Sequence, residues 1–222
     1  MADISALQPR YDKLIRTILT LAYIAGLIGL QVPAVAPLFK MLTPLNLLGT
    51  LAALMWYHTD WRPAFLFYIA LAVLTGYFIE LLGVRTGYVF GGPYAYGEGL
   101  GPKLFDIPPI IGANWLLLTY CFGSLFDRYP WPVYLKTAIA ATAMVALDLV
   151  VEPVAIRLDF WTWFGHPIPI QNYLGWWLVS VALLSIWYGL PFRKDNRLVV
   201  LIISLQVFFF IGHQLLYTLL RN

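Results

Sequence analysis

The sequence predicts an all-α protein, a polytopic membrane helix bundle of about seven transmembrane helices. Hydrophobic residues make up 61% of the 222 residues and charged residues only 11%, whereas a soluble domain carries about 25% charged residues. Apolar runs long enough to cross a bilayer recur along the chain. Since no repeat and no change in composition divides the chain, we expect residues 1–222 to form a single transmembrane helical domain.

The apolar runs define the predicted spans, each judged against the roughly 20 residues that a bilayer requires. The second run is short, and Pro33, Pro37 and Pro44 are expected to bend the first span or end it early. The N-terminal segment lacks the short apolar core and small-residue cleavage site of a signal peptide, so the first span should stay in the mature protein. The predicted spans are 14–36, 43–57, 63–82, 107–126, 132–151, 174–190 and 198–220.

The distribution of Lys and Arg predicts the orientation. More of these residues fall on the side of the N-terminus, which we therefore place in the cytoplasm, with the protein in the inner cell membrane. With seven spans, the two longest connections, 83–106 and 152–173, lie together on the non-cytoplasmic side. A functional site is expected near that face, because most polar residues of the spans fall close to it.

Three acidic residues in or beside the spans are the candidate catalytic groups. Asp148 and Glu152 are four residues apart, so they share one helix face. Two neighbouring carboxyls away from water cannot both ionise at little cost, which predicts a protonated acid beside a carboxylate. Glu152 could instead be a solvated interfacial charge or pair with Arg157 or Arg85. Glu80 is the third acid, with an ion pair to Arg85 as its alternative. Acids within spans generally mark functional sites.

Amide and aromatic side chains near the same face are candidate binding residues. The alternatives are that the Gly- and Tyr-rich loop only anchors the protein at the interface and that the tryptophans belong to an interfacial belt. His213 could hydrogen-bond across helices or join the site. No metal site is expected, because the histidines are scattered, and the lack of a basic run argues against nucleic acid as a partner. The candidates are Phe90, Tyr94, Tyr96, Asn114, Trp115, Trp161, Trp163, Asn172 and His213.

Two blocks of the sequence resemble an integral-membrane carotenoid biosynthesis family, the bisanhydrobacterioruberin hydratases and carotenoid 1,2-hydratases. The first block is ELLGVRTGYVFGGPYAYGEGLGPKLFDIPPIIGANW, from Glu80 to Trp115. The second runs from Asp148 to Trp177 and contains DLVVEPVAIRLDFWTW and IPIQNYLGWW. The order and spacing of the blocks also fit the family. "FGGPY" has one residue more than the family pattern.

The resemblance implies a hydro-lyase that adds water to the terminal C=C of an acyclic carotenoid with a lycopene-type or C50 end. Protonation would give a tertiary carbocation, and capture of water would give a tertiary alcohol. Asp148 would be the proton donor, and Glu80 or Glu152 would orient and deprotonate the water. No cofactor is implied. The implied partners are the carotenoid, water, the lipid bilayer and other carotenoid biosynthesis enzymes.

The same resemblance distributes the remaining roles around the reacting carbon. Aromatic side chains would shield the carbocation, namely Trp161, Trp163, Tyr94 and Tyr96. Asn114 and Asn172 would hold the water or the product hydroxyl.

Other functions remain open from the sequence. A carotenoid cyclase or isomerase would use the same protonation and then lose a proton. A proton-coupled transporter could use the three acids as a relay, although we find no inverted repeat. A retinal-type photoreceptor needs a lysine in a late span, and 198–220 contains none.

Overall fold

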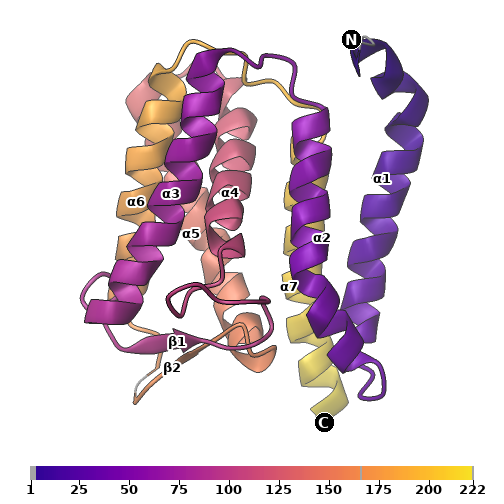
Figure 1. Cartoon of the computed structure of the whole chain (residues 1–222), viewed down its shortest axis with the longest axis vertical. Helices are drawn as coiled ribbons and strands as arrows, with labels where there is room; N and C mark the ends of the chain where they lie inside the picture. The colour runs from indigo at the N-terminus through magenta and orange to yellow at the C-terminus, as the bar shows by residue number, and fades with distance from the viewer. Residues whose placement is uncertain (1–3, 166, 222) are drawn as a thin grey trace.

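The computed structural model describes residues 4–165 and 167–221, which form seven helices and two short strands (Figure 1). The number of helices agrees with the prediction. The elements are α1 (Ile4–Gly29), α2 (Ala36–Trp56), α3 (Pro63–Thr86), β1 (Tyr94–Tyr96), α4 (Ile110–Asp127), α5 (Val133–Arg157), β2 (Trp161–Trp163), α6 (Ile170–Gly189) and α7 (Val199–Arg221).

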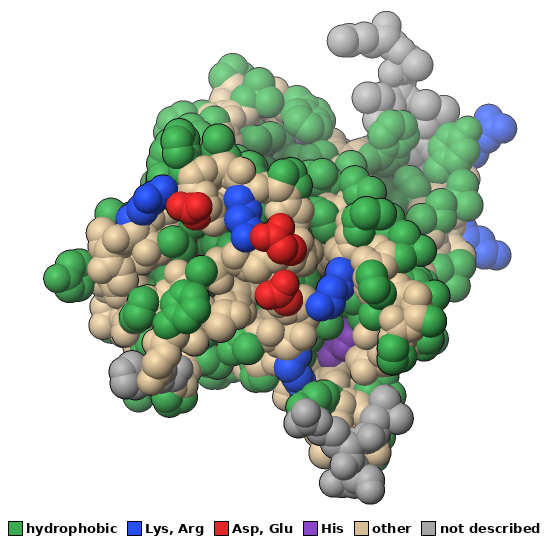
Figure 2. Space-filling model, turned by 60° about the horizontal axis from the view of Figure 1, so that its bottom comes forward, with side chains coloured by type: hydrophobic (Ala, Val, Ile, Leu, Met, Phe, Trp, Pro, Cys, Tyr) green, Lys and Arg blue, Asp and Glu red, His purple; other side chains and the backbone are tan. Residues whose placement is uncertain are grey.

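Five of the described helices, α2, α3, α4, α5 and α7, are long and apolar enough to cross a membrane. The prediction of seven spans is therefore confirmed for these five. The other two described helices, α1 and α6, do not meet the same criteria of length and composition. Large apolar side chains lie exposed on the outside of the bundle, as lipid contact requires, and Figure 2 shows them on its flanks. The chain is an integral membrane protein by these criteria.

The first connection differs from its predicted position. Helix α1 ends at Gly29 and α2 begins at Ala36, so the second helix starts seven residues earlier than the predicted 43. Pro37 lies in the first turn of α2, where its missing N–H costs no hydrogen bond. Pro44 lies inside α2. The proline cluster thus ends the first helix early, which was one of the two expected outcomes.

The helices form two groups that meet at α4 and α5. Helices α3, α4, α5 and α6 pack together, while α1, α2 and α7 pack along their side (Figure 1). The two long connections lie at the same end of the bundle, as predicted, and the N-terminus lies at the opposite end. We call the first of these the ribbon end and the second the N-terminal end. Charged side chains gather on the ribbon end (Figure 2).

The ribbon end takes its name from a two-stranded antiparallel sheet that the sequence analysis did not predict. Strands β1 and β2 pair Tyr94 with Trp163 and Tyr96 with Trp161. Successive side chains of a strand point to opposite faces, so the four aromatic residues share one face and the residues between them share the other. This ribbon lies across the end of the four-helix group.

Candidate active site

The three acids meet beneath the aromatic face of the ribbon. Glu80 comes from the second half of α3, and Asp148 and Glu152 come from successive turns of α5. Their side chains are buried, with 3% of Glu80 and 2% each of Asp148 and Glu152 exposed. The predicted proximity of α3 and α5 acids is therefore observed, and the alternative of a solvated Glu152 is wrong.

Glu80 is surrounded by donors from the first strand and from α4. Its Oε2 accepts hydrogen bonds from the hydroxyls of Tyr94 at 2.7 Å and Tyr96 at 2.9 Å, and its Oε1 accepts one from the Trp115 indole at 3.3 Å. Burial, followed by the charge of Glu80, raises the pKa of Tyr94 and of Tyr96 far above the ordinary tyrosine value. Both hydroxyls therefore remain protonated donors at any physiological pH.

Glu152 is surrounded by donors from the second strand and from α6. Its Oε2 accepts hydrogen bonds from the indoles of Trp161 at 2.9 Å and Trp163 at 3.2 Å. Its Oε1 accepts one from the Asn172 side chain at 3.0 Å. Each strand of the ribbon thus supplies two donors to one glutamate.

Asp148 has a different environment from the two glutamates. Its Oδ2 accepts a hydrogen bond at 3.1 Å from the same Asn172 nitrogen that donates to Glu152. Its Oδ1 is buried and has no hydrogen-bond partner among the described residues. Burial with so few donors disfavours the charged form of a carboxyl more than its neutral form. The arrangement therefore suits Asp148 as a neutral acid beside a carboxylate.

The basic residues at the ribbon end do not neutralise these acids. Arg85, a predicted alternative partner of Glu80 and Glu152, instead lies 3.0 Å from a carboxylate oxygen of Asp106. Arg157 stacks on the ring of Tyr217, with its guanidinium carbon 4.1 Å from the ring centre. Across the described part of the chain, no salt bridge includes any of the three acids. Indole, phenol and amide donors surround the acids in place of cations.

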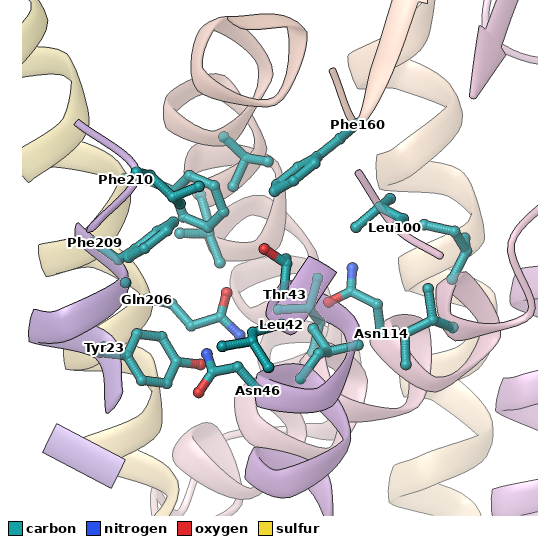
Figure 3. A pocket seen from close by; sticks show the side chains of 18 of the residues that line it. Tyr23, Leu42, Thr43, Asn46, Leu100, Asn114, Phe160, Gln206, Phe209 and Phe210 are labelled. Carbon is teal, nitrogen blue, oxygen red and sulfur yellow. The ribbon is translucent and has the colours of Figure 1, made fainter. Parts of the chain in front are cut away.

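Two cavities border the acids. The larger, of about 470 Å³, lies between the two helix groups and is lined mainly by apolar side chains (Figure 3). Asp148 is one of its few polar lining residues. The smaller, of about 30 Å³, is lined by Glu80, Glu152 and Asn172 together with the ribbon aromatics. Asn114 and Trp161 line both cavities. An apolar chamber and a small polar chamber therefore share a wall beside Asp148.

The structure brings eight of the nine predicted binding residues to these cavities and leaves one elsewhere. Phe90, Tyr94, Tyr96, Asn114, Trp115, Trp161, Trp163 and Asn172 line the small cavity. His213 lines neither cavity: its Nδ1 faces the Gln31 amide and its ring packs edge-on against Phe209. Of the two expectations for His213, a role outside the site is the one observed, although its partner Gln31 lies in the α1–α2 connection and not in a helix.

Trp176 is a cavity residue that the sequence analysis missed. It lines both cavities and stacks on Trp115, with ring centres 4.4 Å apart. The signal was present in the sequence, because Trp176 follows Asn172 by four residues and must share its helix face. This stack joins α4 to α6 at the small cavity.

Glycines in α3 permit the close packing that positions these side chains. A Cβ on Gly76 would lie 2.4 Å from the Cβ of Trp115, and a Cβ on Gly83 would lie 2.5 Å from the Tyr94 hydroxyl oxygen. Gly76 and Gly83 flank Glu80 along the helix. Larger residues at either position would therefore displace donors of the Glu80 carboxyl.

A family model described as carotenoid biosynthesis protein matches residues 19–221, nearly the whole chain. The chain belongs to this family. It is also similar to a bisanhydrobacterioruberin hydratase from Haloarcula japonica, with 36% identity over 136 residues. That match covers 54% of this chain and 45% of the relative, so the chain aligns with less than half of the relative's length. No solved structure matches this chain.

Proposed function

We propose that this protein hydrates the terminal C=C of an acyclic carotenoid and gives a tertiary alcohol. The observation that carries the proposal is the environment of Asp148, a buried acid with one unpartnered oxygen in the wall of an apolar cavity. An unactivated alkene needs a proton donor that keeps its proton and is shielded from water, which a neutral buried carboxyl supplies. Membership of the carotenoid biosynthesis family and similarity to a protein named as a hydratase support this reading.

In the proposed mechanism Asp148 protonates the alkene and becomes a carboxylate, while the substrate becomes a tertiary carbocation. Trp161 and Trp176 line the cavity beside Asp148, and their faces stabilise a cation by about 0.5–2 kcal/mol each. The small cavity has the size of about one water molecule. We place the attacking water there.

The water adds to the carbocation and loses one proton to a neighbouring carboxylate. We assign this role to Glu152, because Asn172 connects it directly to Asp148, while Glu80 orients the water from the other side. One proton leaves Asp148 and one is taken up by Glu152, so a proton transfer back to Asp148 completes the cycle. The site would lie near the non-cytoplasmic face if the N-terminus is cytoplasmic.

The cavity accommodates only part of the proposed substrate. A cavity of about 150 Å³ holds one benzene, so about 470 Å³ encloses an end group and leaves most of a C40 chain outside. Leu42 and Leu45 of α2 line the cavity and are also exposed on the outside of the bundle. We therefore propose that the polyene enters beside α2 and remains largely in the bilayer.

Expression in a lycopene-accumulating host, followed by mass analysis of the pigments, tests the proposal. We expect each hydrated end to add 18 Da, and the Asp148→Asn variant expressed in the same host to add none. Pigments of unchanged mass and chromatographic retention would reject the proposal. A new pigment of unchanged mass would favour a cyclase or isomerase instead.

A further inference from the structure

Two apolar side chains close the large cavity on its ribbon side, and the proposed mechanism leaves them without a role. Phe160, in the connection from α5 to β2, and Leu100, in the connection from β1 to α4, both line the cavity. They are only 4% and 8% exposed, whereas the cavity residues Leu42 and Leu45 of α2 are exposed on the outside of the bundle. A chain that enters beside α2 therefore meets an end wall at Phe160 and Leu100.

The main chain fixes the position of Phe160 from two directions. Its N–H donates to the Ala155 carbonyl in the last turn of α5 at 2.9 Å, and its carbonyl accepts from the Gly97 N–H at 3.0 Å. The preceding residue, Asp159, has a left-handed conformation with a φ of 61°, which aspartate tolerates better than most residues. The chain thus turns at Asp159, and hydrogen bonds on both sides hold Phe160 in place.

A glycine-rich segment, residues 97–101, lies between Phe160 and α2. A Cβ on Gly99 would lie 2.7 Å from a carbon of the Phe160 ring, and a Cβ on Gly101 would lie 3.4 Å from a carbon of Pro44. The main chain of the segment therefore packs directly on the ring on one side and approaches α2 on the other, which glycine permits. This packing leaves the ring little space to withdraw toward the ribbon.

The end wall lies close to the proposed proton donor. Ala155 follows Asp148 by seven residues, which is about 10 Å of helix, and the Phe160 main chain is bonded to Ala155. The Phe160 ring lines the same cavity as Asp148, so the space between ring and carboxyl is shorter than this. Trp161, the next residue, lines both cavities. A group that rests on Phe160 is therefore near the donor and near the proposed water.

The double bonds of an acyclic carotenoid compete for the proton. The internal bonds are conjugated, so protonation of one of them gives a delocalised cation, which forms more readily than the isolated tertiary cation at the chain end. Reactivity alone therefore favours the wrong bond, and the terminal bond must be selected by position. A wall just beyond the proton donor does this, because it stops the chain before an internal bond reaches the donor.

We infer that Phe160, backed by Leu100, is the stop that selects the terminal double bond for protonation. The inference rests on the proposed function and adds the residue that determines which bond reacts. Figure 3 shows Phe160 and Leu100 on one side of the cavity, away from the amides of Gln206 and Asn46. The apolar wall suits the branched methyl end of the chain, whereas burying the amides against that end would leave them unpaired.

The test identifies which bond of lycopene is hydrated by the purified protein in lipid vesicles. Hydration of the terminal bond adds the mass of one water and leaves the visible absorption unchanged, because that bond is not conjugated. Hydration of a conjugated bond adds the same mass but shifts the absorption to shorter wavelength. Mass analysis and absorption of the separated products therefore give the ratio of terminal to internal hydration.

We expect the unmodified protein to give terminal hydration alone. Phe160→Ala removes a ring similar in size to one isoprene unit and should lower the ratio at least about 10-fold, since small changes in an apolar pocket have effects of this size. Phe160→Leu should lower the ratio less. Phe210→Ala is the matched control, because Phe210 lines the same cavity from α7, and it should keep the ratio of the unmodified protein whatever its rate.

The outcomes separate this inference from the proposed function. Terminal product alone from Phe160→Ala, or an equal fall of the ratio in Phe210→Ala, would overturn the inference and leave the hydratase proposal intact. If Phe160→Ala gives no product, terminal product alone from Phe160→Leu would overturn the inference in the same way. A failure of the unmodified protein to hydrate lycopene would instead overturn the proposed function, and the inference with it.

Discussion

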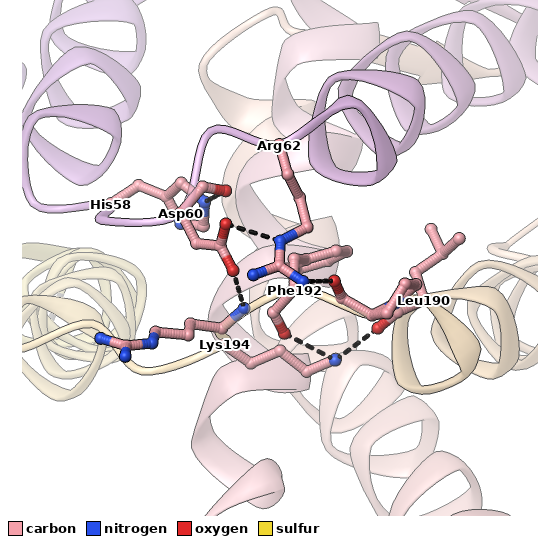
Figure 4. A network of polar contacts seen from close by, with 8 residues as sticks. His58, Asp60, Arg62, Leu190, Phe192 and Lys194 are labelled. Carbon is pink, nitrogen blue, oxygen red and sulfur yellow. Dashed lines mark hydrogen bonds and ion pairs between the residues drawn. The ribbon is translucent and has the colours of Figure 1, made fainter.

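The two ends of the bundle both bury polar groups, but they treat charge in opposite ways. At the N-terminal end, Asp60 accepts hydrogen bonds from the guanidinium of Arg62 and from the main-chain N–H of Arg193, each at 2.8 Å (Figure 4). Lys194 donates to the carbonyls of Leu190 and Phe192 at 2.9 and 3.1 Å. Asp60 and Arg62 carry opposite charges and compensate one another, and the Lys194 ammonium is hydrogen-bonded to two carbonyls.

This network joins the connection between α2 and α3 to the connection between α6 and α7. His58 adds a contact to the Tyr120 hydroxyl at 2.8 Å and another to the Asp60 carbonyl at 2.8 Å. Burial lowers the pKa of His58 below the ordinary histidine value, so the imidazole is neutral near pH 7. The network therefore serves to hold the helix connections together.

The ribbon end has three buried acids and no compensating cation among the described residues. Two of the acids are surrounded by neutral donors, and Asp148 keeps one oxygen unpaired. The comparison teaches that a compensated charge serves the fold, whereas an uncompensated buried acid marks a candidate functional site.

The largest expected effect is from Asp148→Asn. We expect it to lower hydration by about 10²- to 10⁴-fold, the usual contribution of a general acid, because the amide cannot donate the required proton. The melting temperature should stay close to that of the unmodified protein, since the amide preserves the shape of the side chain. Product analysis and thermal unfolding of the purified protein measure the two effects. Normal hydroxylated product from this variant would refute the proton-donor assignment.

Glutamine substitutions of the two glutamates should sharpen the assignment within the ribbon end. We expect Glu152→Gln to lower turnover by about 10²-fold, because the water would lose its base. Glu80→Gln should have a smaller effect, since Glu80 is proposed only to orient the water. Turnover of both variants on the same carotenoid measures the difference. The reverse order would transfer the role of base to Glu80.

Trp161→Leu should separate cation stabilisation from anchoring. Trp161 lines both cavities, whereas Trp163 lines only the small one, and both donate to the same oxygen of Glu152. Trp163→Leu is therefore the matched control for the lost hydrogen bond. We expect Trp161→Leu to lower kcat about 10-fold, as loss of a cation–π contact of about 1.4 kcal/mol predicts, with little change in KM. Equal losses in the two variants would indicate that Trp161 acts only through Glu152.

The smallest effect on turnover is expected at the N-terminal end, from Asp60→Asn. The Arg193 main-chain N–H and the Arg62 guanidinium hold the pKa of Asp60 below its ordinary value. The carboxylate therefore adds stability that is present above about pH 4 and is lost as the pH falls further. Thermal unfolding should show a lower melting temperature for Asp60→Asn at pH 7, and the difference from the unmodified protein should shrink in acid. A large loss of hydration at unchanged stability would contradict the comparison between the two ends.

The sequence by itself determined the class of the protein and the location of its acids. Apolar runs interrupted by a few connections can form only membrane helices, because lipid offers no partner to unpaired backbone groups. Consecutive membrane helices run in alternating directions, so the third and fifth helices end on the same side. The two long connections, Glu80 and the Asp148–Glu152 pair must therefore lie at one end. The spacing of four residues placed both acids of α5 on one face, and the structure shows them there.

Only the tertiary structure decided which of the three acids has fewer hydrogen-bond donors than the other two. The pairing of β1 with β2 joins segments more than sixty residues apart, and such long-range pairing has no local signal beyond the alternation in "YAY" and "WTW". That pairing supplies the donors that surround Glu80 and Glu152 and leaves Asp148 with a single shared one. The apolar cavity likewise exists only where six helices meet, so its volume could not be read from any one of them.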